Sequence, residues 1–240
     1  MNASPRRGAE EAVGIDPASG ASLYGRGLFV LLALLVALVW FAVSAGRPLF
    51  NPDEGRYAEI PREMLIGGDW VIPHLDGLIY IEKPPLQYWA TALSYRLLGL
   101  SAFSARLVPT LTALGTLLVV FFLVRAAWNE RAAWRAAAVL ASLSLFPVIG
   151  QMVSLDMSLC FYLTAALAAF LMAQARPHRA RVWMALAWAA TALGVLTKGL
   201  EAVAIPAVTV ALYSLIARDA GLWKRLGFGV GVPLFIAIAV

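Results

Sequence analysis

Long apolar runs are the feature that most constrains how this chain can fold. The 240-residue sequence is 61% hydrophobic and 14% charged, with a mean hydropathy of +0.78, and ordinary soluble domains are far less apolar. A helix needs about 20 apolar residues to cross the hydrocarbon core of a bilayer. The predicted spans are Leu28–Ala45, Leu107–Val124, Trp134–Val153, Leu159–Ala173, Trp183–Leu196, Val203–Ala217 and Leu226–Val240. We therefore expect an all-α, polytopic integral membrane protein with about seven transmembrane helices.

The basic residues predict how these spans are oriented. Three connections between apolar runs are basic, and cytoplasmic loops are enriched in Arg and Lys. The residues are Arg125, Arg131 and Arg135, then Arg176, Arg179 and Arg181, then Arg218, Lys224 and Arg225. One topology places all three clusters and a polar tail over residues 1–27 in the cytoplasm, provided that the short run Leu86–Leu98 does not cross. Such clusters and a net charge of +5 fit membrane topology better than nucleic-acid binding.

Residues 28–240 then form one transmembrane domain, which we expect to be the N-terminal part of a longer protein. An alternative for the first span is a cleaved signal peptide, because Val43-Ser44-Ala45 is typical of a cleavage site. The single cysteine, Cys160, excludes an intrachain disulfide.

This topology places one long loop, residues 46–106, on the non-cytoplasmic side. The turns at Ser154–Ser158 and Thr197–Glu201 emerge on that side too. The charged residues that these segments bring to one membrane face are Asp53, Glu54, Arg56, Glu82, Lys83, Asp156, Lys198 and Glu201. Charges beside a bilayer are costly, so this convergence predicts a functional site.

Two short helices are expected within the loop. Asn51 and Pro52 are typical of a helix start, and Gly67-Gly68 of a helix end. At helical spacing Tyr57, Ile60 and Met64 share one side, which predicts an amphipathic helix at the membrane interface. Pro84-Pro85 then precedes a second short helix over Leu86–Leu98.

Each candidate residue also has a purely structural interpretation. Asp53 can be a first-turn acid that complements the helix dipole, and Asp156 can cap the helix after it. Lys198 can reach toward the interface or pair with Glu201, and Lys83 can bind lipid headgroups. His74, a lone histidine in a turn, is a weak candidate for a ligand.

Two motifs resemble a known family. Asp53-Glu54-Gly55-Arg56-Tyr57-Ala58-Glu59 and Glu82-Lys83-Pro84-Pro85-Leu86-Gln87-Tyr88-Trp89 are similar to motifs of the bacterial aminoarabinose transferases that modify lipid A. These group with the protein O-mannosyltransferases among the polyprenyl-phosphate-dependent glycosyltransferases of the GT-C fold. The Gly68-Asp69-Trp70 segment, Asp156 and the Leu196-Thr197-Lys198-Gly199 turn agree with the resemblance, which covers about residues 28 to 225.

The resemblance implies roles for particular residues. It implies catalytic acids at Asp53 and Asp156 and a donor-binding group for the lipid phosphate, made of Arg56, Tyr57, Lys83 and Lys198. It also implies a divalent metal at Glu82 together with a histidine from a later region of such proteins. The implied reaction is an inverting transfer of a sugar such as 4-amino-4-deoxy-L-arabinose, from undecaprenyl phosphate to a periplasmic lipid or glycan acceptor such as lipid A. The implied location is the bacterial inner membrane, with the site facing the periplasm.

The chemistry of the residues agrees with this interpretation. A lipid phosphate leaves readily once cations neutralise it, and Arg56 and Lys83 supply cations. Asp53 would take the proton of a hydroxyl acceptor, or orient a phosphate acceptor. Two alternatives remain: a transporter, whose key charges usually lie near the membrane midplane, and a membrane anchor whose loop binds headgroups.

Overall fold

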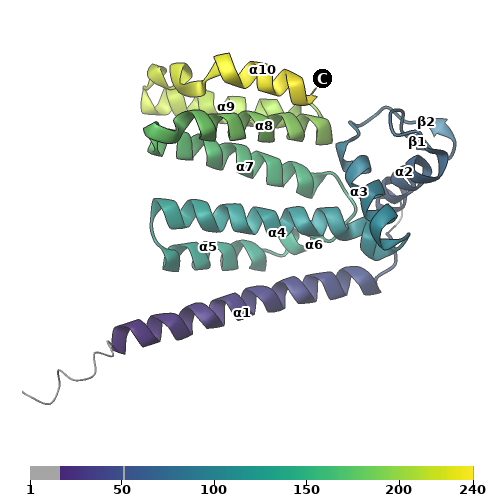
Figure 1. Ribbon diagram of the computed structural model, residues 1–240, viewed down its shortest axis with the longest axis horizontal. Coiled ribbons are helices and arrows are strands. Elements are labelled where there is room, and N and C mark those ends of the chain that lie inside the picture. Colours follow the sequence, from purple (N-terminus) through teal and green to yellow (C-terminus); the bar gives the residue numbers. More distant parts are fainter. Residues whose placement is uncertain (1–16, 51, 240) are drawn as a thin grey trace, which may run out of the picture. The chain divides into compact units, whose positions relative to one another are not determined.

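The computed structural model describes residues 17–50 and 52–239 and is mostly helical (Figure 1). The chain divides into two compact units, Met1–Val39 and Trp40–Val240. The described part of the first unit, residues 17–39, belongs to helix α1 (Pro17–Gly46), and its exposed residues are largely apolar. Residues 1–16 of the predicted cytoplasmic tail lie outside the described residues.

The second unit contains nine α-helices among its described residues. After the end of α1 come α2 (Asp53–Gly67), α3 (Leu86–Leu98) and α4 (Ala102–Ala127). They are followed by α5 (Glu130–Ser142), α6 (Leu145–Gly150), α7 (Asp156–Ala175) and α8 (Ala180–Lys198). The chain continues through α9 (Glu201–Ala217) to α10 (Phe228–Ala239), and short 3-10 turns occupy Pro177–Arg179 and Ala220–Leu226.

Three segments are long and apolar enough to cross a membrane, namely Ala102–Ala127, Asp156–Ala175 and Pro177–Lys198. The apolar helices Glu201–Ala217 and Phe228–Ala239 are shorter, as is the segment Ala33–Gly46 of α1. Large apolar side chains such as Leu118, Phe122 and Leu212 remain exposed on these helices. An apolar exterior of this kind is what a lipid environment favours.

The predicted span Trp134–Val153 is not one continuous helix, because the structure divides it into α5 and α6. Leu143 is extended, with φ −65° and ψ 120°, and ends α5. Pro147 explains the break, since in a continuous helix its ring would clash with the carbonyl of Leu143, four residues earlier. Within the first turn of the separate helix α6, a proline is tolerated.

The all-α prediction also missed a small hairpin. Strands β1 (His74–Leu75) and β2 (Leu78–Ile79) pair antiparallel, with His74 opposite Ile79 and Leu75 opposite Leu78. The two turn residues have positive φ, 53° at Asp76 and 75° at Gly77. Asp-Gly is the sequence that such a two-residue turn favours, so a signal for the hairpin was present.

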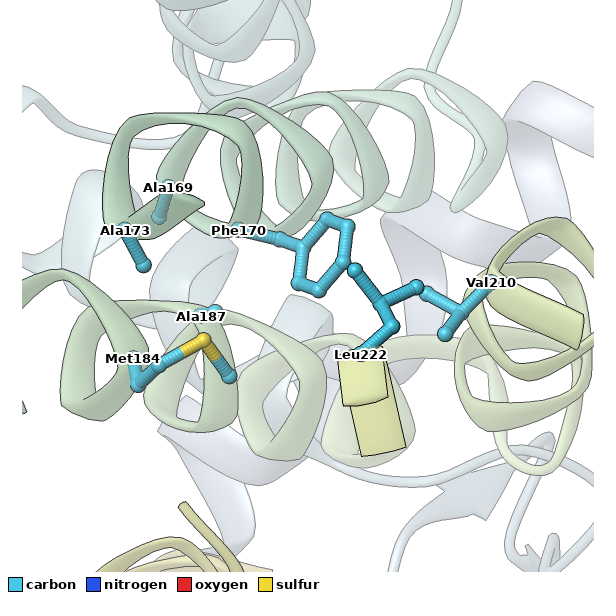
Figure 2. Packing of buried hydrophobic residues seen from close by; sticks show 7 residues of the cluster. All are labelled: Ala169, Phe170, Ala173, Met184, Ala187, Val210 and Leu222. Carbon is cyan, nitrogen blue, oxygen red and sulfur yellow. The ribbon is translucent and has the colours of Figure 1, made fainter. Parts of the chain in front are cut away.

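The most extensive contact between two helices joins α7 to α8; α9 packs against both of them, and α10 packs against α8 (Figure 1). Figure 2 shows the apolar cluster there, in which the ring of Phe170 lies near Leu222 and Val210, with Met184 and Ala187 below it. Small residues such as Ala169 and Ala173 let the two helices approach closely. This packing sets the position of the α7–α8 pair, whose ends at Asp156 and Lys198 belong to the candidate site.

Candidate active site

Helix α2 begins the candidate site and follows the predicted pattern closely. It runs from Asp53 to Gly67, and Gly68 ends it in the left-handed conformation with φ 74°. The predicted N-cap, Asn51, lies outside the described residues, and Pro52 immediately precedes the helix. As predicted, Tyr57, Ile60 and Met64 share one side, and the structure packs that side against Tyr88 of α3.

Asp53 lies in the first turn of α2 and remains accessible. Its Oδ1 accepts a hydrogen bond from Nη2 of Arg56 at 2.7 Å, and the two side chains are 59% and 37% exposed. The guanidinium of Arg56 also stands 5.1 Å from the centre of the Tyr57 ring. Its Nε is sheltered and has no partner within the described ranges. Arg56 therefore retains a donor that an incoming anion can use.

Glu54, the next residue, is fully buried and binds Arg106 of α4. Both side chains are 0% exposed, and the two carboxylate oxygens accept hydrogen bonds from Nε and Nη2 of Arg106 at 2.8 and 2.7 Å. The backbone N–H groups of Phe50 and Val153 also donate to Glu54, at 2.8 and 3.0 Å. Burial opposes ionisation most strongly, but the hydrogen bonds from Arg106, Val153 and Phe50 together lower the pKa of Glu54.

Arg106 completes this arrangement by binding three backbone carbonyls. It donates to the oxygens of Ser44, Arg47 and Pro48 at 3.1, 2.6 and 2.7 Å. The ion pair thus joins the end of α1, the start of α2, helix α4 and the segment just before α7. The sequence predicted no separate role for Glu54, one of the charges on the non-cytoplasmic side, and no role for Arg106. A lone arginine beside an apolar run was the available signal, since such a charge usually has a partner.

Tyrosine side chains from three segments meet beside Arg56. The rings of Tyr57 and Tyr88 stack with centroids 6.4 Å apart, and the Tyr80 hydroxyl donates to Glu82 at 2.5 Å. Burial and the bond to Glu82 raise the pKa of Tyr80 to about 12. Burial raises the pKa of Tyr57 as well, and the carboxylates of Asp53, Glu82 and Asp156 add to that effect. The charges of three predicted acids therefore all raise the pKa of the Tyr57 phenol.

Asp156 and Lys198 lie at the neighbouring ends of α7 and α8. Lys198 Nζ donates to Asp156 Oδ1 at 2.5 Å and also lies 3.5 Å from Glu201, so the structural alternative of a Lys198–Glu201 pair is observed beside the contact with Asp156. Asp156 is the first residue of α7 rather than its cap. The hydrogen bond from Val153 to Glu54 places this segment close to the start of α2.

Lys83 is half-buried and precedes Pro84-Pro85 and α3. Within residues 17–50 and 52–239, no side chain pairs with its ammonium group. It therefore offers an uncompensated cation next to Glu82. His74 belongs to β1, and its backbone has a structural role in the hairpin.

The predicted metal ligand, Glu82, does not form a site with its neighbours. Three potential ligands do come within 4.8 Å of one another among the described residues, but these are Glu59, Glu63 and Asp76. Glu59 binds Arg62, and Glu63 accepts the backbone N–H of Asp76. Glu82 accepts the Tyr80 hydroxyl instead. A divalent metal needs several ligands, so the residues described here do not hold the implied ion by themselves.

The fold and the site define a class: multi-helix membrane proteins whose charged residues gather beyond one end of the apolar helices. Residues 26–240 match the sequence model of the family described as dolichyl-phosphate-mannose-protein mannosyltransferase. The chain belongs to this family.

Individual relatives agree. The chain is 37% identical, over 88% of its length and 37% of the relative's, to an undecaprenyl phosphate-alpha-4-amino-4-deoxy-L-arabinose arabinosyl transferase of Pectobacterium atrosepticum. It is 39% identical, over 78% of its length and 35% of the relative's, to the protein of that name in Aeromonas salmonicida. The chain thus spans little more than a third of the length of these relatives.

Solved structures show the same resemblance. ArnT from Cupriavidus metallidurans bound to undecaprenyl phosphate matches with a TM-score of 0.84 at 40% identity, over 88% of this chain and 39% of that one. An oligosaccharyltransferase from Archaeoglobus fulgidus matches with a TM-score of 0.65 at 16% identity, over 89% of this chain and 30% of that one. The second match shows a shared fold alone.

Proposed function

We propose that this chain carries part of the active site of an inverting glycosyltransferase that uses undecaprenyl phosphate-linked 4-amino-4-deoxy-L-arabinose. The acceptor that fits best is a periplasmic lipid or glycan such as lipid A. One observation carries the proposal: the charges of Asp53, Arg56, Glu82 and Asp156 all act on the phenol of Tyr57, and Asp156 is the first residue of a long apolar helix. The named donors of the relatives supply the substrate class.

Each residue has a role that its contacts support. Arg56 and Lys83 would neutralise the lipid phosphate as it leaves, Arg56 through its sheltered and unpartnered Nε–H and Lys83 as a point charge. Tyr57, against the guanidinium of Arg56, would position it. Lys198 holds Asp156 and can turn toward the donor.

Asp53 would act at the acceptor. If the acceptor is a hydroxyl, the Asp53 carboxylate takes its proton as the oxygen attacks the sugar carbon and the lipid phosphate departs from the opposite face. If the acceptor is a phosphate, Asp53 only orients it. Arg56 now bonds Asp53, and an incoming phosphate would compete for the same guanidinium. A single displacement of this kind inverts the configuration at the sugar carbon.

The whole domain would sit in the bacterial inner membrane with about seven spans and the site facing the periplasm. Leu78 of the hairpin and Arg179 between α7 and α8 would then lie on opposite sides. Leu78 and Arg179 are both exposed, so a cysteine at either position is open to a reagent on its own side. In a Cys160→Ser background, we expect an impermeant thiol reagent added to the periplasm to label Leu78→Cys and not Arg179→Cys. Labelling of both positions from that side would contradict this topology.

The reaction is tested by release of the sugar from a polyprenyl phosphate donor by the full-length protein in liposomes. Release that depends on an acceptor supports the glycosyltransferase. Donor binding without release would favour a lipid-binding membrane protein, and movement of intact substrate across the bilayer would favour a transporter.

A further inference from the structure

A groove of about 920 Å³ lies between α4, α7 and α8, the helices that contain the three candidate membrane spans. Its walls are aliphatic and aromatic side chains, among them Phe122, Phe161 and Leu193. Ligand sites in proteins commonly have volumes of roughly 300–1,000 Å³, so the groove is large enough for a small lipid segment. The residues that line it come from neither α2 nor α3, so it is separate from the candidate active site.

Two arginines line the same groove. Arg125 lies in the last turn of α4, and Arg176 directly follows α7. Both side chains are exposed, and neither guanidinium has an ion pair within the ranges that the structure describes. Figure 1 shows the C-terminal ends of α4 and α7 at the end of the helices opposite α2 and α3. The groove is therefore apolar along its length and cationic at one end.

Trp183, in the first turn of α8, lines the groove at this cationic end. Its indole Nε1 is sheltered and has no hydrogen-bond partner among the described residues. Tryptophan favours the headgroup layer of a bilayer, where its ring is in apolar surroundings and its N–H meets polar groups. The indole of Trp183 and the two guanidinium groups thus line one groove, and all three are donors of the kind from which a phosphate oxygen accepts hydrogen bonds.

We propose that this groove binds an anionic phospholipid, with an acyl chain along the apolar walls and the phosphate at Arg125 and Arg176. The charge complementarity selects the ligand, because basic pockets between transmembrane helices recognise acidic headgroups. A zwitterionic lipid carries its own ammonium group, which offsets the attraction to the arginines. Binding of this lipid does not depend on the proposed glycosyl transfer.

The test is lipid binding to the purified full-length protein, measured by native mass spectrometry with phosphatidylglycerol and phosphatidylcholine. We expect the wild type to prefer phosphatidylglycerol. Arg125→Gln with Arg176→Gln should weaken that binding about tenfold, since each arginine contributes to headgroup attraction. The matched control is Arg179→Gln with Arg181→Gln, which removes two charges near Arg176, between α7 and the start of α8, from residues that do not line the groove. We expect it to change binding less than threefold.

A second variant tests the apolar part. Ala165 is half-buried in the wall of the groove, and Ala165→Phe would fill it while leaving both arginines in place. We expect this variant to remain folded, by its size-exclusion profile, and to lose the bound lipid. Equal binding of the two lipids, or retention of phosphatidylglycerol by Ala165→Phe and by the Arg125/Arg176 double variant, would overturn the proposal. If another segment of the full-length protein covers the groove, the variants will also retain phosphatidylglycerol, and the proposal is overturned in the same way.

Discussion

Two adjacent acids at the start of α2 are in opposite environments. Asp53 is more than half exposed and bonds a partly exposed arginine three residues away, whereas Glu54 is fully buried and bonds Arg106, 52 residues away. An exposed pair contributes only about 0–1 kcal/mol and exchanges partners at little cost. A buried charge that loses its partner costs several times more. The comparison supports the proposed chemical role of Asp53 and shows that Glu54 holds together the segments around it.

The difference follows from what each pair connects. The Asp53–Arg56 pair lies within one turn of one helix, so breaking it moves nothing else. The Glu54–Arg106 pair joins α2 to α4 and, through Val153, to the segment before Asp156. One motif thus contains both the proposed reactive group, Asp53, and Glu54, which fixes the segments around it.

The largest effect on stability should come from Glu54→Gln. The amide cannot neutralise Arg106, which would remain charged in a buried site, so we expect a loss of about 3–5 kcal/mol in the free energy of unfolding. Denaturant unfolding in detergent measures it. Glu59→Gln, which removes the partly exposed partner of Arg62 on the same helix, is the matched control and should cost at most about 1 kcal/mol. Equal losses of unfolding free energy in the two variants would contradict the distinction between the buried and the accessible ion pairs.

Among the accessible cations, Lys83 should matter far more than Arg62. Lys83 has no described partner and is predicted to bind the donor phosphate, whereas Arg62 is already paired with Glu59. A hydrogen bond to a charged group contributes about 1.5–3 kcal/mol, so Lys83→Ala should reduce kcat/KM about tenfold to a hundredfold. Arg62→Ala should leave kcat/KM nearly unchanged. Small, equal losses would mean that Lys83 only anchors the loop.

A smaller effect should appear in the pH dependence of stability. The folded state lowers the pKa of Glu54 below its ordinary 4.5. The stabilisation from ionised Glu54 is therefore fully present above about pH 4.5 and is lost as the pH falls through the lower folded value. Glu54→Gln lacks this component at every pH. The difference in unfolding free energy between wild type and variant should be constant from pH 7 to 5 and shrink below 4.5, and a difference that grew on acidification would contradict the assignment.

Local signals predicted the two helices of the loop well. Gly67-Gly68 set the end of α2, and the prolines set the start of α3, whose predicted bounds Leu86–Leu98 match the structure. Helical spacing alone also predicted the apolar face of α2, which consists of Tyr57, Ile60 and Met64. The break at Leu143 was missed because overall hydropathy outweighed one proline in the prediction of a span.

Contacts between residues far apart in the sequence could not be predicted from local signals. Nothing within a few residues of Glu54 indicates that its partner is Arg106, because that pairing depends on how α2 and α4 pack. The Lys198–Asp156 contact likewise depends on the α7–α8 pairing. Composition and topology predicted that the charges would share one side of a membrane. Which of them would be buried and which accessible required the structure.

The most direct test of the account is sugar release from the polyprenyl phosphate donor by Asp53→Asn in full-length protein, with unfolding measured on the same sample. Asparagine retains the volume of Asp53 and can accept hydrogen bonds at a helix start, but it cannot take a proton. We expect turnover to fall roughly a hundredfold or more, while stability changes by at most about 1 kcal/mol. Near-normal turnover in folded Asp53→Asn would contradict the catalytic assignment and reduce Asp53 to a first-turn acid.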